Sequence, residues 1–228
     1  MKYWLLPATV WSVLAQSPAD LIRFSGYEWE VKTSQSPAGP GPNYFGRDGV
    51  WVDSEGRLHL RIRFEEGRWT CAEVINRKSL GLGAYTFVVD DTSHLDPQVV
   101  LGLFTWDSNA PQENYREIDV EVSRWTEPAN SNGQFVLKAR ESSDNIVRFE
   151  VPPGIVSHSF LWAASQVRFR SLLVPGGRLI REHTFSEGIP AAGSERARIN
   201  LWLAGGQPPS NGQPAEVVIR EFSFRPPP

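Results

Sequence analysis

Apolar and polar side chains alternate with a period of two along much of this chain, and helical periodicity is nearly absent after the first 15 residues. Alternation of this kind is typical of β-strands that bury one face. It predicts strands in the stretches 57–64, 146–151, 167–170, 199–203 and 217–224. In the last stretch the apolar parity changes, which predicts a β-bulge near Arg220 and Glu221.

Turn-forming residues separate these stretches. Gly, Pro and Asn cluster at 54–56, 132–133, 152–154, 175–177 and 210–212. Many short strands joined by such turns, with few helices, predict a β-sandwich or jelly roll. The Pro- and Gly-rich stretch 34–42 is too short for a domain linker, and no internal repeat is visible, so we expect one domain.

The first 15 residues have the features of a secretory signal peptide. Lys2 is their only charge, the run 3–14 is mainly apolar, and Ala15 precedes the expected cleavage site. The alternative is a buried N-terminal strand or helix, which Pro7 would interrupt. We therefore predict an exported protein, extracellular or periplasmic, whose mature domain covers 16–228. No later run approaches the 18 apolar residues of a membrane span.

Composition excludes several classes of function. A formal net charge of −3 argues against nucleic-acid binding, and no glycine-rich phosphate loop is present. The four histidines show no metal-ligand spacing, and the single cysteine, Cys71, is expected to be a small buried residue rather than a nucleophile. No cofactor is therefore expected; a structural calcium ion bound by backbone oxygens would leave no sequence trace. We expect a monomer. Nine tryptophans in 228 residues favour a sugar-binding surface, although a sandwich core also uses several.

The stretch 115–123 carries the candidate chemistry. In a strand, its apolar residues point to one face, and Glu117, Asp119 and Glu121 point to the other. If the strand continues in both directions, Tyr115 and Trp125 share the face of the carboxylates. Neighbouring acids on this face lie about 6.6 Å apart at Cα, a range at which like charges raise one another's pKa.

Such a cluster suits acid–base chemistry. A carboxyl group that keeps its proton near neutral pH can act as a general acid, and one that stays ionised can act as a nucleophile. The Cα atoms of Glu117 and Glu121 would lie about 13 Å apart, whereas the working carboxyl groups of retaining glycosidases are about 5–5.5 Å apart. The two side chains must therefore lean together, with Asp119 between them. The alternative is a solvated acidic stripe without function.

The sequence resembles glycoside hydrolase family 16, which includes lichenases, laminarinases and xyloglucan-modifying enzymes. The stretch 117–121 is similar to the Glu-Ile-Asp-x-Glu signature of that family. Other blocks follow in the family's order over the chain from about Gly49 onward, namely Cys71-Ala72-Glu73-Val74, Gly81-Leu82-Gly83-Ala84-Tyr85, Leu103-Phe104-Thr105-Trp106, His158-Ser159-Phe160 with Trp162, and Asn200-Leu201-Trp202.

This resemblance implies a concanavalin-like jelly roll of two antiparallel sheets that cleaves a β-linked polysaccharide or oligosaccharide with retention. It implies that Glu117 is the nucleophile, Asp119 the assisting carboxylate and Glu121 the acid/base. The residues that would contact sugar are Glu73, Trp106, Tyr115, Trp125, Asn200 and Trp202.

The sequence also departs from the lichenase pattern. Tyr115 replaces a Trp, Ile75 replaces a sugar-binding Arg, and Val136 replaces an Asn. Cys71 lacks the partner cysteine that lichenases often have. These changes remove the basis for predicting a mixed-linkage glucan as the substrate, while the carboxylate set is intact.

Several alternatives stay open at this point. Trp106, Trp162 and Trp202 can line a cleft or fill the core, and Glu73 indicates either a cleft or a buried ion pair. Asn43 can line the cleft or brace a turn. A non-catalytic, lectin-like protein on the same fold and a structural surface protein are the competing functions.

Overall fold

The computed structural model describes residues 20–138 and 145–227, and the signal peptide predicted for residues 1–15 lies outside them. Strands dominate the described chain, and its three 3₁₀ segments are η2 (Arg47–Gly49), η3 (Pro111–Arg116) and η5 (Ala204–Gly206). The strands are β1 (Leu21–Phe24), β2 (Tyr27–Val31), β3 (Tyr44–Phe45), β4 (Val50–Val52), β5 (Leu58–Glu65), β6 (Arg68–Asn76), β7 (Gly83–Val89), β8 (Val99–Trp106), β9 (Ile118–Val122), β10 (Gly133–Leu137), β11 (Ile146–Phe149), β12 (Ile155–Ala163), β13 (Gln166–Val174), β14 (Arg178–Phe185), β15 (Arg196–Leu203) and β16 (Ala215–Arg225).

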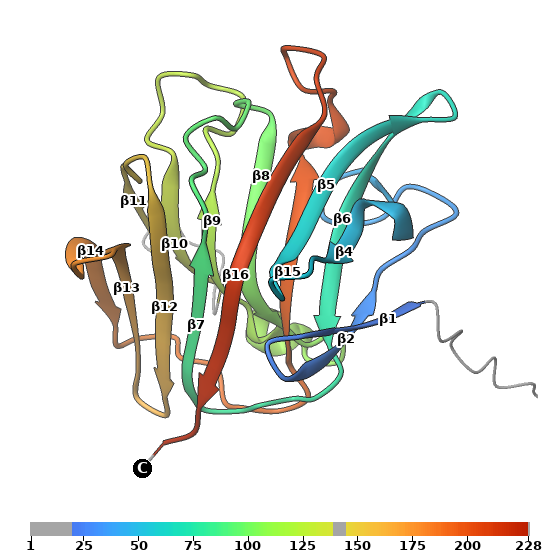
Figure 1. Cartoon of the computed structure of the whole chain (residues 1–228). Coiled ribbons are helices and arrows are strands. Elements are labelled where there is room, and N and C mark those ends of the chain that lie inside the picture. The colour runs from blue at the N-terminus through green and yellow to red at the C-terminus, as the bar shows by residue number, and fades with distance from the viewer. Residues whose placement is uncertain (1–19, 139–144, 228) are drawn as a thin grey trace, which may run out of the picture.

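Two layers of strands face each other (Figure 1). One layer has the order β11-β10-β9-β8-β15-β6, extended by the β1–β2 hairpin, and the other has the order β5-β16-β7-β12-β13-β14 with β4 on β5. The β5–β6 hairpin joins them. All pairings are antiparallel except that of β3 with β6. The predicted jelly-roll sandwich is confirmed.

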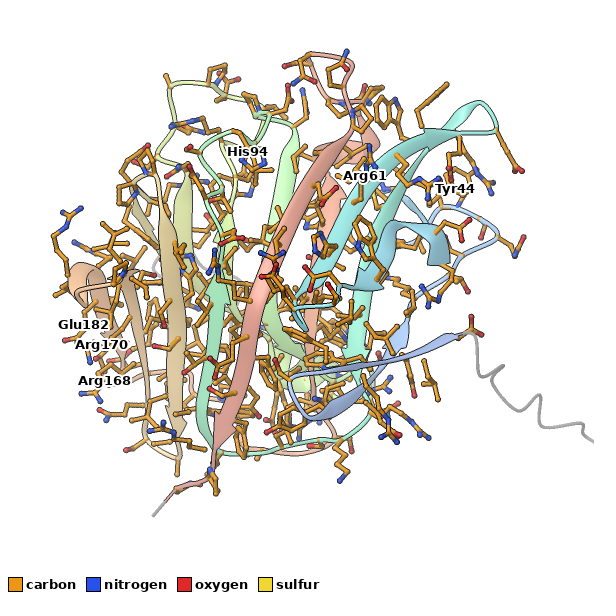
Figure 2. The ribbon with its side chains drawn as sticks, in the orientation of Figure 1. Tyr44, Arg61, His94, Arg168, Arg170 and Glu182 are labelled. Carbon is orange, nitrogen blue, oxygen red and sulfur yellow. The ribbon has the colours of Figure 1, made fainter. Side chains whose placement is uncertain are left out.

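Alternation places the core between the layers. On β9, Ile118, Val120 and Val122 are fully buried, as their parity predicts. Trp162 on β12 is also fully buried, and its indole Nε1 donates to the carbonyl of Pro190 at 3.1 Å. Trp162 is therefore a core residue and not part of the cleft. Charged side chains such as Arg168, on the outer strand β13, lie on the surface instead (Figure 2).

Local predictions match the structure at several points. The pairing of β16 with β7 shifts register between Ile219 and Glu221, where the bulge was expected. Cys71 is buried, as expected, and burial raises the pKa of its thiol to about 12. Asn43 donates to the carbonyls of Pro40 and Leu203 at 2.8 and 2.9 Å, which is the turn-bracing alternative.

Within residues 20–138 and 145–227, no helix is long and apolar enough to cross a membrane. The same residues contain no group of three or more His, Cys, Asp or Glu side chains placed to hold a metal ion.

Candidate active site

A cleft of about 830 Å³ lies on the face of the β9 layer that points away from the core. All nine residues singled out in the sequence line it, although they come from six separate segments of the chain. They are Glu73, Trp106, Tyr115, Glu117, Asp119, Glu121, Trp125, Asn200 and Trp202. The cleft alternative therefore holds for Trp106 and Trp202.

Strand register explains why residues so distant in sequence meet. Glu73 on β6 pairs with Asn200 on β15, which pairs with Gly102 on β8. Gly102 pairs with Glu121 on β9, and Glu121 pairs with Gln134 on β10. Paired residues point to the same face of a sheet, so these positions form one row across the cleft floor. A Cβ on Gly102 would lie 2.5 Å from the side-chain oxygen of Asn200, so glycine leaves room for that amide.

The neighbouring row contains two of the three departures from the lichenase pattern, Ile75 and Val136. Arg198 on β15 pairs with Ile75 on one side and with Phe104 on the other. Phe104 pairs with Asp119, which pairs with Val136. Ile75 and Val136 thus lie at opposite ends of the row that holds Asp119, and Arg198 supplies a guanidinium next to Ile75.

The carboxylate strand is shorter than the alternation predicted. β9 begins at Ile118, immediately after Glu117. Asn114, Tyr115 and Arg116 have φ values of 47°, 59° and 53°, and Trp125 has a φ of 46°. The expectation that the strand continues through Tyr115 and Trp125 is wrong. Both rings reach the cleft because left-handed turns at the two ends of β9 direct them there.

Buried interactions hold the turn before Glu117. The Arg116 guanidinium contacts the Asp107 carboxylate at 2.9 Å and donates to the carbonyl of Ala191 at 2.6 Å. The Trp106 and Tyr115 rings stack with centroids 4.3 Å apart and an interplanar angle of 8°. Left-handed backbone at non-glycine residues costs about 1–3 kcal/mol each and persists only where surrounding contacts enforce it. This network supplies such contacts.

The carboxyl groups of Glu117, Asp119 and Glu121 differ in environment. Burial raises the pKa of Asp119 well above its ordinary value, and the charges of Glu117 and Glu121 raise it further. Burial also raises the pKa of Glu121, even though Lys138 and a hydrogen bond from the Gln134 amide act in the opposite direction. The sequence predicted raised pKa values from the repulsion between like charges alone, whereas burial is the larger cause.

Lys138 is a cation that the sequence interpretation missed. Its ammonium Nζ lies 3.2 Å from Oε1 of Glu117, and it directly follows β10. Lys138 thus places a cation beside Glu117, whereas burial raises the pKa of Asp119 and of Glu121.

Glu73 lies in the wall of the cleft and in a buried ion pair at once. Its carboxylate is 1% exposed and contacts Lys32 at 2.8 Å and Arg198 at 3.0 Å. The two alternatives from the sequence are thus both true. At the other side of the cleft, the Arg148 guanidinium lies 4.4 Å from the centre of the Trp125 ring.

Unsatisfied polar atoms gather in this cleft. Among the described residues, seven buried side-chain nitrogen or oxygen atoms have no hydrogen-bond partner. Four of them belong to cleft residues, namely Asp119 Oδ1, Gln134 Oε1, Arg198 Nε and Asn200 Oδ1. Leaving such groups unpaired is costly in a folded protein.

No protein-family model and no curated protein matches the sequence. Solved structures do match in fold. A β-glucanase of Bacillus licheniformis is 17% identical with a TM-score of 0.65, covering 92% of this chain and 94% of its own. A LamA variant from Zobellia galactanivorans in complex with laminaritriose and laminaritetraose is 16% identical with a TM-score of 0.59, covering 86% and 91%. A Mycobacterium tuberculosis protein described as an immunostimulatory antigen and pseudo β-1,3-glucanase is 17% identical with a TM-score of 0.63, covering 84% and 88%. This chain has the β-glucanase fold.

Within the β-glucanase fold, sequence alone located the acids and aromatic rings of the cleft but missed its cations and Gln134. Gln134 belongs to β10, Lys138 directly follows that strand, and Arg198 belongs to β15. Arg198 alternates with apolar residues in its own strand. That alternation shows only that its side chain points away from the core, and the pairing of the strands decides which residues it contacts.

The buried Asp119 predicts a pH effect on stability. Because its native pKa is raised, the folded chain holds this proton more tightly than the unfolded chain. The resulting stabilisation is complete below the unfolded pKa of about 3.9 and is lost as the pH rises through the native pKa. We expect Asp119→Asn to raise the free energy of unfolding near neutral pH by about 1 kcal/mol. Urea unfolding at several pH values measures this, and a variant less stable than wild type at neutral pH would contradict it.

Proposed function

We propose that this protein is a retaining endo-β-glycosidase acting on a β-linked polysaccharide. The observation that carries the proposal is the carboxyl set of the cleft, in which Glu117 lies beside an ammonium group while burial raises the pKa of Asp119 and Glu121. One protein of similar fold was solved in complex with laminari-oligosaccharides, which supports a β-linked polysaccharide as the substrate.

The proposed reaction has two steps. The Glu117 carboxylate attacks the anomeric carbon while the bond to the glycosidic oxygen breaks, and Glu121 donates its proton to that oxygen. Glu121 then removes a proton from water, or from a sugar hydroxyl group in transglycosylation. The incoming oxygen attacks the anomeric carbon and releases Glu117. Protonated Asp119 donates a hydrogen bond to Glu117 and keeps a third negative charge out of the site.

The remaining cleft residues would bind the chain of sugars. The stacked Trp106 and Tyr115 rings and the half-buried Trp202 offer flat apolar surfaces for pyranose faces. Asn200 and Gln134 line the cleft, and their side-chain oxygens have no hydrogen-bond partner within the protein. Secretion and a monomeric state stay predictions beside this proposal.

The test is release of reducing ends from a panel of β-glucans, galactans and xyloglucan by wild type, Glu117→Gln and Glu121→Gln. We expect wild type to cleave at least one polymer and both variants to lose that activity. Equal activity in all three proteins would contradict the assignment of the site.

One observation favours a second candidate, a carbohydrate-binding protein without turnover. Glu117 is held in an ion pair with Lys138, and one protein of the same fold is described as a pseudo-glucanase. Binding to a glycan by all three proteins, with no release of reducing ends by any, would favour this candidate.

Lys138 provides a separate prediction about pH dependence. The charge of Lys138 acts against the burial that raises the pKa of Glu121, so this pKa should rise further when the charge is removed. Lys138 is half exposed, and solvent screening limits the effect. We expect the basic limb of kcat/KM, which reports the acid, to move to higher pH in Lys138→Met and to stay in place in Lys138→Arg. An unshifted limb in Lys138→Met would show that Lys138 does not tune Glu121.

A further inference from the structure

The cleft wall around Glu73 presents cations to a ligand, and the carboxylate itself is occupied. Oε2 of Glu73 accepts from Lys32 at 2.8 Å, and Oε1 accepts from Arg198 at 3.0 Å. The carboxylate is only 1% exposed. A sugar lying against this wall therefore meets the two cationic side chains before it meets Glu73.

The two cations differ in what they have left to donate. The Lys32 ammonium also donates to the carbonyl of Gly39 at 2.5 Å and lies 4.0 Å from the centre of the Phe45 ring. Its hydrogen-bonding capacity is largely used inside the protein. Arg198 contacts Glu73 through Nη1, whereas its Nε is buried without a partner. Its cross-strand neighbour, Ile75, is apolar. Arg198 is therefore the cation of this wall that has an N–H group still unpaired.

The wall around Glu73 carries an excess of positive charge. Two cations, Lys32 and Arg198, contact one carboxylate, that of Glu73. This leaves one positive charge in a partly buried wall, where its field is weakly screened.

Resting on the proposed function, we propose that Arg198 determines specificity in this cleft and binds an acidic substituent, a carboxylate or a sulfate, on the sugar unit beside Glu73. A guanidinium presents several N–H donors in a planar fork that matches two oxygens of such a group. The Arg198 side chain is 12% exposed. A charge-assisted hydrogen bond is stronger at a site that is largely shielded from solvent, because the local dielectric constant is low. The contact with Glu73 uses one nitrogen of the fork, Nη1.

The experiment compares kcat/KM on a neutral β-glucan, a uronate-containing polysaccharide and a sulfated galactan, each at low and high salt. We expect wild type to prefer one acidic polymer over the neutral one by roughly 10-fold or more, with a preference that weakens as salt rises. The uronate and sulfate arms show which acidic group is recognised. Arg198→Met should lose this preference, and Arg198→Lys should keep part of it.

Two further variants separate specificity from folding. Arg196→Met is the matched control, since Arg196 lies two residues earlier on β15, pairs with Glu30 at 2.8 Å and does not line the cleft. Its preference should equal that of wild type. Arg198→Met leaves Glu73 with one cation, so the double variant Glu73→Gln/Arg198→Met removes both partners and should also lack the preference. Thermal unfolding confirms that each variant is folded.

A wild-type preference for the neutral glucan would overturn this inference, as would an acidic preference that persists in folded Arg198→Met. In either case, cleavage that still requires Glu117 and Glu121 would leave the proposed function standing. Absence of both cleavage and binding with every polymer would overturn the proposed function and this inference together.

Discussion

Glu117→Gln should abolish cleavage, with a loss in kcat of roughly 10⁴-fold or more on the polysaccharide that wild type cleaves. The amide cannot form the glycosyl ester, so no covalent route remains. Glu117 is mostly buried at the start of β9, and Gln has nearly the same shape, so the fold should persist. Steady-state release of reducing ends measures the loss, and an unchanged thermal midpoint serves as the control.

The acid/base variant should behave differently from the nucleophile variant. Glu121→Gln should lose roughly 10²–10⁴-fold on polysaccharide, because the leaving oxygen is no longer protonated. On an aryl β-glycoside with a good leaving group the first step needs no proton, so the glycosyl-enzyme should form and added azide should restore turnover. Glu117→Gln should show no such rescue. Rescue of both variants, or of neither, would contradict the division of roles between the two residues.

Arg116→Met should be the most destabilising single change near the site. Removing the guanidinium leaves Asp107, which is 3% exposed, without its cation and releases the carbonyl of Ala191. An uncompensated buried charge costs about 3–5 kcal/mol. We expect the free energy of unfolding to fall by about 3 kcal/mol and KM to rise, because the strained turn that carries Tyr115 loses its anchor. Urea unfolding and kinetics on the same samples measure both effects.

The matched control for that change is an exposed ion pair. Arg170 and Glu182 lie on β13 and β14 at the surface (Figure 2), with their side chains 44% and 42% exposed and 2.9 Å apart. Arg170→Met should change the free energy of unfolding by less than about 1 kcal/mol. Equal losses in Arg116→Met and Arg170→Met would show that the Asp107 network does not hold the turn.

The sequence predicted what depends on periodicity within one strand. The parity of Ile118, Val120 and Val122 determines which side of β9 is buried, and it places the three acids on the opposite face. The same reasoning placed Trp202 in the cleft and the bulge beside Glu221, because each depends only on nearby residues. These features need no knowledge of which strands pair.

Features that depend on pairing or on irregular backbone were not predictable in this way. Arg198 meets Glu73 and Lys138 meets Glu117 only after β15 and β10 dock in their registers. The left-handed turns at Tyr115 and Trp125 are enforced by tertiary contacts such as those of Arg116, and neither residue type favours that backbone. The position of the acids was thus readable from the chain, while their electrostatic partners required the fold.

Covalent trapping tests the central claim most directly. A 2-deoxy-2-fluoro β-glycoside with a good leaving group, built on the glycan that wild type cleaves, should form a glycosyl ester that accumulates because its breakdown is slow. Peptide mass spectrometry should find the added mass on Glu117, and Glu117→Gln should remain unlabelled. A label on Asp119 or Glu121, or release of the inverted anomer without any adduct, would contradict the account of Glu117 as the nucleophile.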